Sequence, residues 1–314
     1  MLSVTVLFWV ALVRPSIALH SQPKSEKIII GRQNLYRHVE ALSREYSPRN
    51  YSNIDNLNAA AAYIKRQFEN IGHEVIVQKY RGDNEAYKNV MINLGPQGGP
   101  KLVIGAHYDA AGPFPGADDN ASGVAGLIEL ARLLKDEPLN KGVTLIAYTL
   151  EEPPFFGTGD MGSYIHAQSE RENDVDIELM ISLEMIGYFT EEENSQSFPM
   201  GILSLFYPDK GNFIAVIDQL FSDNARKVKV AMSKNSSIPV YSMNAPVFVP
   251  GVDFSDHRNY WAQGYDAVMV TDTAFYRNEM YHTEGDTLDR LDFDKMGEVI
   301  KGVYGFIKLY SEIH

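Results

Sequence analysis

Apolar residues along this chain gather in short continuous runs that alternate with longer segments of helix formers. An apolar run of about four to eight residues is typical of a buried strand, whereas about ten or more helix-forming residues favour a helix. On this basis we expect strands at residues 73–80, 85–95, 102–107, 143–150, 177–183 and 266–272. We expect helices at residues 54–71 and 124–137, near 161–168 and 213–223, and from 294 to 313.

Strands that alternate with helices predict an α/β fold of three layers, in which helices cover both faces of a central, mostly parallel mixed sheet. In such a sheet the ligand site lies beyond the C-terminal ends of the strands. No linker rich in Pro or Ser divides the chain, so we expect one catalytic domain over residues 51–314, preceded by a lead-in segment at 19–50. Residues 189–250 have the least regular pattern, and we expect them to form one wall of a pocket.

The N-terminus carries a separate signal. Residues 1–13 are apolar but too few to span a bilayer. Arg14 interrupts the run, and the tripeptide Ser-Ile-Ala at 16–18 then offers a cleavage site with small residues. We therefore expect residues 1–18 to be the signal peptide of a secreted or periplasmic protein, with no stable membrane insertion after cleavage. The alternative is an uncleaved N-terminal anchor.

Composition narrows the chemistry. Acidic residues outnumber basic ones by 41 to 28, which gives a formal net charge of −13. A nucleic-acid-binding surface needs clustered Lys and Arg, so we expect no nucleic-acid partner. The chain has no cysteine, which excludes disulfides, thiolate metal sites and cysteine nucleophiles. Any metal must therefore be held by His, Asp and Glu side chains.

Polar side chains gather where the expected strands end or just beyond them. They are His107 with Asp109, Asp118 with Asp119, Glu151 with Glu152, Glu184, Asp272 and His282. A metal-bound imidazole needs its second nitrogen held, and a carboxylate two residues away on the same side of an extended backbone can do so. Adjacent carboxylates repel each other unless a cation or a proton intervenes. Two His and several carboxylates suit zinc, with manganese or cobalt as substitutes.

Five motifs occur in order: HYDA at 107–110, PGADDNASG at 115–123, TLEEP at 149–153, LEMIGY at 183–188 and YHTEGDT at 281–287. From Lys101 to the C-terminal helix, this set resembles the M28 family of zinc aminopeptidases. The resemblance implies a zinc exopeptidase-like fold and two zinc ions per chain. The ligands that it implies are His107, Asp119 in preference to Asp118, Glu152, Glu184 and His282. It also implies a cis peptide between Asp119 and Asn120.

The resemblance assigns further roles. Glu151 matches the general base, which takes a proton from the attacking water and later passes it to the leaving amine. Tyr281 is a candidate for stabilising the oxyanion, and the alternative is a buried core tyrosine. Asp109 and Asp286 would hold the second nitrogens of the two ligand histidines. Glu184 stands where many members have Asp, so this chain keeps the charge and adds a methylene.

The implied function is a two-zinc metallopeptidase, an aminopeptidase acting on peptides with a free N-terminus. An acidic site attracts a protonated amine and repels a carboxylate. One alternative is a glutaminyl cyclase-like enzyme with a single zinc. Another is a carboxypeptidase, in which Arg258 or Arg277 would anchor the substrate carboxylate. A third is an inactive receptor-type ectodomain, although such relatives lose ligands and this chain has a competent residue at every ligand position.

Aromatic residues cluster near the motifs. They are Phe155, Phe156, Phe254, Tyr260, Trp261, Phe275 and Tyr276. We expect some of them to line a pocket for an apolar first residue of the substrate and more of them to belong to the core. Asp256 and His257 lie between these aromatics and outside the matched motifs, and we interpret His257 as a structural residue.

Overall fold

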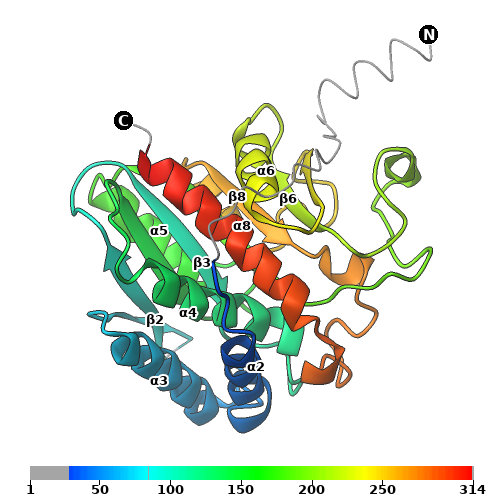
Figure 1. The fold of residues 1–314 in the computed structure, drawn as a ribbon. Helices are drawn as coiled ribbons and strands as arrows, with labels where there is room; N and C mark the ends of the chain where they lie inside the picture. The colour runs from blue at the N-terminus through cyan, green and yellow to red at the C-terminus, as the bar shows by residue number, and fades with distance from the viewer. Residues whose placement is uncertain (1–27, 84, 313–314) are drawn as a thin grey trace.

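The computed structural model describes residues 28–83 and 85–312, which form an eight-stranded sheet with helices on both faces (Figure 1). The strands are β1 (Ile76–Gly82), β2 (Glu85–Leu94), β3 (Lys101–His107), β4 (Gly142–Tyr148), β5 (Ile177–Glu184), β6 (Ile214–Asp218), β7 (Val240–Asn244) and β8 (Ala267–Thr271). Their order across the sheet is β1-β2-β4-β3-β5-β8-β6-β7. The expected signal peptide at residues 1–18 lies outside the described residues.

Four neighbouring strands, β4, β3, β5 and β8, run parallel through the centre of the sheet. Antiparallel pairs lie outside them: β1 with β2 and β2 with β4 on one side, and β6 with β8 on the other. The expected mostly parallel mixed sheet is therefore confirmed. The central strands are covered on both faces and are almost entirely apolar, as in β4, where all seven residues are buried.

The helices lie in two outer layers. The α-helices are α2 (Arg32–Glu40), α3 (Ile54–Ile71), α4 (Gly123–Leu134), α5 (Gly162–Glu172), α6 (Asn224–Asn235), α7 (His257–Ala262) and α8 (Phe293–Glu312). Buried side chains of α2, α3, α4, α6 and α8 share one core with one face of the sheet, and Figure 1 shows α4 and α8 in front of the strands. Ala167 of α5 and Tyr260 of α7 pack on the opposite face. This arrangement confirms the three-layer α/β fold.

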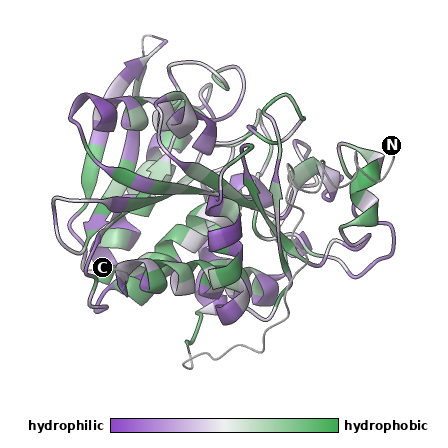
Figure 2. Cartoon of the chain, turned by 90° about the horizontal axis from the view of Figure 1, so that it is seen from above, coloured by the Kyte–Doolittle hydropathy of each residue, from purple (hydrophilic) through white to green (hydrophobic). Residues whose placement is uncertain are grey.

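Helix α3 shows how the sequence defines one of these elements. Its buried residues, among them Leu57, Ile64 and Phe68, recur at the spacing of one helix face. Burying a side chain of this kind contributes about 1.5–3 kcal/mol. The helix ends at its C-cap, Gly72, which adopts a left-handed conformation with φ of 106°. Figure 2 shows mixed green and purple along the helices, as expected where only one helix face is buried.

The structure corrects the prediction for residues 213–223. The pattern there was interpreted as a helix, but Ile214–Asp218 forms strand β6, and α6 begins only at Asn224. All five residues of β6 are buried, and a continuous apolar run without helical periodicity is the pattern of a strand covered on both faces. The neighbouring strand β7, parallel to β6, was not predicted.

Helix α2 lies in the segment 19–50 that the sequence pattern places ahead of the catalytic domain. Its residues Leu35 and Val39 are fully buried and belong to the same core as α4 and α8. The described part of this segment therefore packs against the domain. Within the two described ranges, none of the helices combines the length and the hydrophobicity that a membrane span requires.

Candidate metal centre

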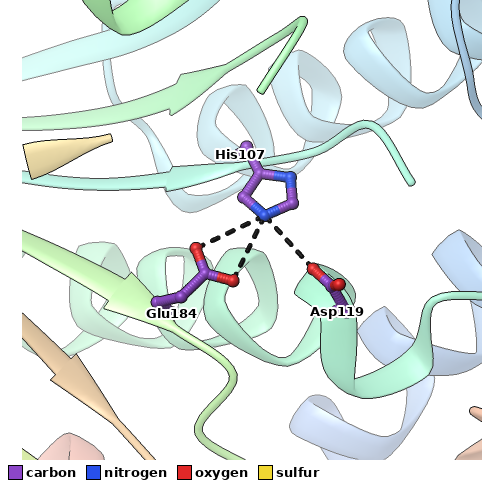
Figure 3. Close-up of side chains that lie close together, drawn as sticks. All are labelled: His107, Asp119 and Glu184. Atoms are coloured by element: carbon purple, nitrogen blue, oxygen red, sulfur yellow. Dashed lines mark hydrogen bonds and ion pairs between the residues drawn. The ribbon is translucent and has the colours of Figure 1, made fainter. Parts of the chain in front are cut away.

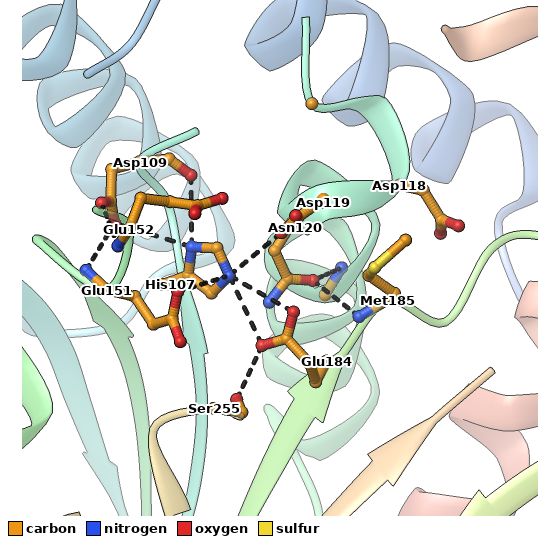
Figure 4. A network of polar contacts seen from close by, with 12 residues as sticks. His107, Asp109, Asp118, Asp119, Asn120, Glu151, Glu152, Glu184, Met185 and Ser255 are labelled. Atoms are coloured by element: carbon orange, nitrogen blue, oxygen red, sulfur yellow. Dashed lines mark hydrogen bonds and ion pairs between the residues drawn. The ribbon is translucent and has the colours of Figure 1, made fainter. Parts of the chain in front are cut away.

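Four of the side chains expected at the site meet at the C-terminal edge of the central strands (Figure 4). His107 is the last residue of β3 and Glu184 the last residue of β5. Glu151 and Glu152 follow β4 closely. Because β3 lies between β4 and β5, three adjacent strand ends bring these residues together. All four side chains are buried.

Asp119 and His282 approach the same place from loops. Asp119 lies in the short helix η2 (Ala117–Ser122) directly before α4, and its own backbone is not helical. The Asp119–Asn120 peptide is cis, as the resemblance implies. His282 lies between β8 and α8 and is partly exposed. Asp119 thus meets one histidine from the preceding strand, β3, and another from a loop far along the chain.

One donor group consists of His107, Asp119 and Glu184 (Figure 3). The His107 Nε2 atom lies 3.3 Å from Asp119 Oδ1 and 3.4 Å from Glu184 Oε2. A second group consists of Asp119, Glu152 and His282. The His282 Nε2 atom lies 3.0 Å from Asp119 Oδ2 and 3.2 Å from Glu152 Oε2. Asp119 therefore presents one carboxylate oxygen to each group.

The donor set fits a cation. Imidazole and carboxylate donors without sulfur suit zinc. The Oε1 atom of Glu152 is buried and has no hydrogen-bond partner among the described residues, an arrangement that is costly unless a cation pairs with it. Burial, together with the nearby Asp119 carboxylate, raises the pKa of Glu152 to about 8. A bound cation would stabilise the ionised carboxylates and remove this repulsion.

Glu151 occupies a distinct position at the centre. It shares a possible donor group with His107 and Glu152 but not with Asp119. Its Oε2 atom lies 3.8 Å from His107 Nε2. Burial raises the pKa of the Glu151 carboxyl well above its usual range, and the neighbouring Glu184 carboxylate adds to this rise while His107 opposes it. Such an environment is typical of a general acid or base.

Asp109 supports the centre from behind His107. Its Oδ1 atom lies 3.6 Å from His107 Nδ1. Its two carboxylate oxygens accept hydrogen bonds from the backbone N–H groups of Glu151, at 3.2 Å, and Glu152, at 3.1 Å. The His107 Nδ1 atom hydrogen-bonds to the carbonyl oxygen of Asp109, at 3.2 Å, so Asp109 links the imidazole to the loop that carries both glutamates through its backbone as well as its carboxylate.

Asp286 lies elsewhere than the resemblance implies. We expected its carboxylate behind His282, but it accepts hydrogen bonds from the backbone N–H groups of Asp118, at 3.0 Å, and Asp119, at 3.1 Å. These N–H groups lie in the first turn of the short helix η2. The first N–H groups of a helix have no carbonyl partner within the helix, so they need an acceptor from elsewhere. Asp286 thus holds the loop that carries Asp119.

With this geometry established, comparison with known proteins identifies the family. The sequence profile of peptidase family M28 matches residues 89–307. The chain belongs to peptidase family M28. The uncharacterized protein YfbL of Escherichia coli is 48% identical over 92% of this chain and 88% of its own length. A probable leucine aminopeptidase 1 of Trichophyton verrucosum is 25% identical over 96% of this chain and 81% of its own length.

Solved structures confirm the fold. LapB of Legionella pneumophila has a TM-score of 0.72 at 21% identity, with 100% of this chain and 82% of that chain covered. A zinc aminopeptidase of Bacillus subtilis has a TM-score of 0.72 at 15% identity and 92% and 97% coverage. A glutaminyl cyclase of Fimbriiglobus ruber has a TM-score of 0.65 at 19% identity and 93% and 99% coverage. The zinc exopeptidase-like fold is therefore shared by both classes of enzyme.

Sequence patterns did not point to two polar residues of this M28 centre. The Ser255 hydroxyl donates to Glu184 Oε2 at 2.6 Å and thereby orients that carboxylate. The Oδ1 atom of Asn120 accepts from the backbone N–H groups of Gly123, at 3.1 Å, and Met185, at 3.2 Å, and so joins η2 to the end of β5. In the sequence, Ser255 is marked only by its place next to Asp256, and Asn120 only by its place in the Asp-Asp-Asn motif.

Other acids and histidines near the motifs lie outside the two donor groups. The oxygens of Asp118 accept hydrogen bonds from the backbone of Gly187, at 2.9 Å, and from Asn278 Nδ2, at 3.2 Å; Figure 4 shows this side chain turned away from His107. Buried His257 contacts the Val252 carbonyl oxygen at 2.8 Å through Nε2. This contact is consistent with a structural role for His257.

An apolar cavity adjoins the centre. It contains about 800 Å³ of empty space, its open mouth included, and both Glu184 and Tyr281 line it. Strands β6 and β7 contribute lining residues, so part of the 189–250 segment forms a wall as expected. Of the aromatic residues singled out in the sequence, Phe254, Phe275 and Tyr276 line this cavity, while Phe155 and Tyr260 belong to the hydrophobic cores. The Tyr281 ring stacks on the His282 ring with centroids 3.7 Å apart.

We expect Zn²⁺ to raise the unfolding temperature of the metal-free protein. An ion that binds only the folded state stabilises it by about 2.7 kcal/mol when its free concentration is 100 times its Kd. Thermal unfolding followed by circular dichroism, before and after zinc is added to chelated protein, measures the shift. His282→Ala should lose part of this zinc-dependent shift in unfolding temperature. The control His73→Ala, at a residue beyond the end of α3, should show the full shift. Equal shifts in these two variants would contradict the site.

Proposed function

We propose that this M28 family member is a two-zinc metallo-aminopeptidase that removes N-terminal residues from peptides. The observation that carries the proposal is the position of Asp119, whose two carboxylate oxygens face separate donor groups. A carboxylate shared in this way is the usual bridge of a two-metal hydrolase. One zinc would be held by His107, Asp119 and Glu184, and the other by Asp119, Glu152 and His282.

The chain's own residues supply the rest of the chemistry. When bound, two zinc ions would lower the pKa of a water molecule towards about 7 and polarise the scissile carbonyl. The Glu151 carboxylate accepts the proton of the attacking water and delivers it to the leaving amine. Asp109 keeps the Glu151 backbone fixed relative to His107. The Tyr281 hydroxyl, at the border of the apolar cavity, donates a hydrogen bond to the oxyanion.

The charges at the centre support recognition of a free N-terminus. The carboxylates of Asp119, Glu151, Glu152 and Glu184 balance the four positive charges of two zinc ions. No surplus positive charge then remains to bind a substrate carboxylate, and the net charge of −13 also favours a protonated amine. The side chain of the first substrate residue would enter the adjoining apolar cavity.

The two arginines that a carboxypeptidase would need are engaged within the protein, although the buried Nη2 atom of Arg277 has no hydrogen-bond partner among the described residues. Arg277 is buried, and its Nε and Nη1 atoms donate to Gln196 Oε1 and to the Phe213 carbonyl oxygen, each at 2.9 Å. Arg258 pairs with Asp253 at 3.5 Å and lies over an aromatic ring. These contacts support the aminopeptidase over the carboxypeptidase. A complete donor set also supports an enzyme over an inactive receptor-type ectodomain. Secretion or periplasmic location stays a prediction from residues 1–18.

Substitution of the two adjacent glutamates should separate proton transfer from metal binding. Glu151→Gln should keep both metals and lose about 10²–10⁴-fold in kcat, because an amide cannot accept the proton. Glu152→Gln should reduce the metal content, because it removes a charged ligand. Metal analysis of the purified variants and steady-state kinetics provide the readouts. If both variants held the same metal and retained the same rate, this division of roles would be wrong.

Blocking one end of a peptide should show which end is recognised. We expect N-terminal acetylation of a phenylalanyl peptide to suppress hydrolysis, because it removes the positive charge, and C-terminal amidation to have little effect. Mass spectrometry of the products measures both. Loss of activity on amidation alone would indicate a carboxypeptidase. Conversion of a glutaminyl peptide to its cyclic form, with one zinc bound, would instead indicate a glutaminyl cyclase.

A further inference from the structure

Arg49 is fully buried directly behind the loop that carries Asp119. A guanidinium has five N–H donors, and here each of them is directed at a backbone carbonyl oxygen. The acceptors are the carbonyl groups of Leu42, Tyr108, Pro115, Gly116 and Asp119. Since three of these acceptors lie between residues 115 and 119, the arginine spans the whole turn that leads to the bridging carboxylate.

The loop fits closely around this guanidinium. Gly116 has φ of 56°, and a Cβ atom there would lie 2.2 Å from the Asp119 carbonyl oxygen and 2.9 Å from Arg49 Nη2. Any other residue at Gly116 would therefore push the loop away from its anchor. Asp286 holds the same loop from the other side, through the backbone N–H groups of Asp118 and Asp119. The turn is thus held by a cation on its carbonyl side and by a carboxylate on its amide side.

Neighbouring contacts tie this arginine to the rest of the fold. The Arg49 carbonyl oxygen accepts from the backbone N–H of Ala110 at 3.0 Å. The Asn50 side chain donates to the carbonyl oxygen of Gly112, and its Oδ1 atom accepts from the N–H of Asn53 at 3.1 Å, just before α3. The segment before α3 is therefore bonded at several points to the loop between β3 and α4.

We propose that Arg49 is a positioning residue of the metal centre, which fixes the Pro115–Asp119 turn and thereby keeps the Asp119 carboxylate between the two donor groups. Its charge acts in two directions, because a buried cation repels incoming metal ions but also stabilises the ionised carboxylates around it, those of Asp119 and Asp286 among them. Arg49 forms no ion pair within the described residues, and every donor is used on the backbone. Its effect on metal affinity should therefore come from geometry. The proposal rests on the proposed metal centre.

Two substitutions separate geometry from charge. Arg49→Lys keeps the positive charge but cannot bond to five carbonyl groups at once. Arg49→Met removes the charge and all of these hydrogen bonds. We expect each variant, titrated in its metal-free form, to bind Co²⁺ and Zn²⁺ about 10–100-fold more weakly than the unsubstituted chain, the range typical of residues that orient metal ligands. The Co²⁺ absorption spectrum should also change, because the ligand geometry changes. Arg277→Met is the matched control, since it removes another buried arginine that bonds to backbone carbonyl groups but not to this loop.

The outcomes separate this proposal from its alternatives. If Arg49→Lys binds both metals with unchanged affinity and an unchanged Co²⁺ spectrum, the proposal fails. Tighter binding by Arg49→Met would assign Arg49 a purely electrostatic effect, which also overturns it. An equal loss of affinity in Arg277→Met would reduce the effect to general destabilisation. Should Arg49→Met not fold, Arg49→Lys decides alone. Failure of the unsubstituted chain to bind two Co²⁺ ions would instead overturn the proposed function itself.

Discussion

Repulsion between buried carboxylates is the constraint that the rest of this structure must satisfy. Asp119, Glu152 and Glu184 lie within reach of two imidazoles, and Glu151 is buried beside them. Burial raises the pKa of the three glutamates, so they ionise with difficulty unless cations accompany them, whereas contacts with both histidines outweigh burial and lower the pKa of Asp119. The fold must hold them together before any cation arrives. Residues outside the donor groups provide this support. Asp109, Asn120 and Asp286 hydrogen-bond to the backbone of the segments that carry the donors and so fix their positions.

The sheet topology provides the framework for this arrangement. Parallel strands end at a common edge, and the order β4-β3-β5 brings three strand ends side by side. Asp109 then joins the β3 end to the loop after β4, and Asn120 joins η2 to the β5 end. These cross-links explain why Asp109 and Asn120 can occupy the interior at this edge, because their side-chain oxygens accept hydrogen bonds from backbone N–H groups. The apolar cavity lies next to this polar edge and is lined in part by residues of β6 and β7.

Much of this arrangement could be predicted from the sequence, because apolar runs mark buried strands and the polar residues follow them directly. The prediction for residues 213–223 is wrong because a short apolar run can belong to either a buried strand or a buried helix, and periodicity alone does not distinguish them. The position of Asp286 could not be predicted, because its partners are backbone N–H groups of a distant loop. Arg49 gave no signal for the same reason. Its acceptors are carbonyl groups, which every residue carries.

The central proposal is that Asp119 would hold two zinc ions, one together with His107 and the other together with His282. The most direct test is a crystal structure of the zinc-loaded protein, with anomalous scattering measured on both sides of the zinc absorption edge. The account predicts two zinc peaks, one beside each oxygen of the Asp119 carboxylate. A single peak at full occupancy, or two peaks of which neither contacts Asp119, would contradict it.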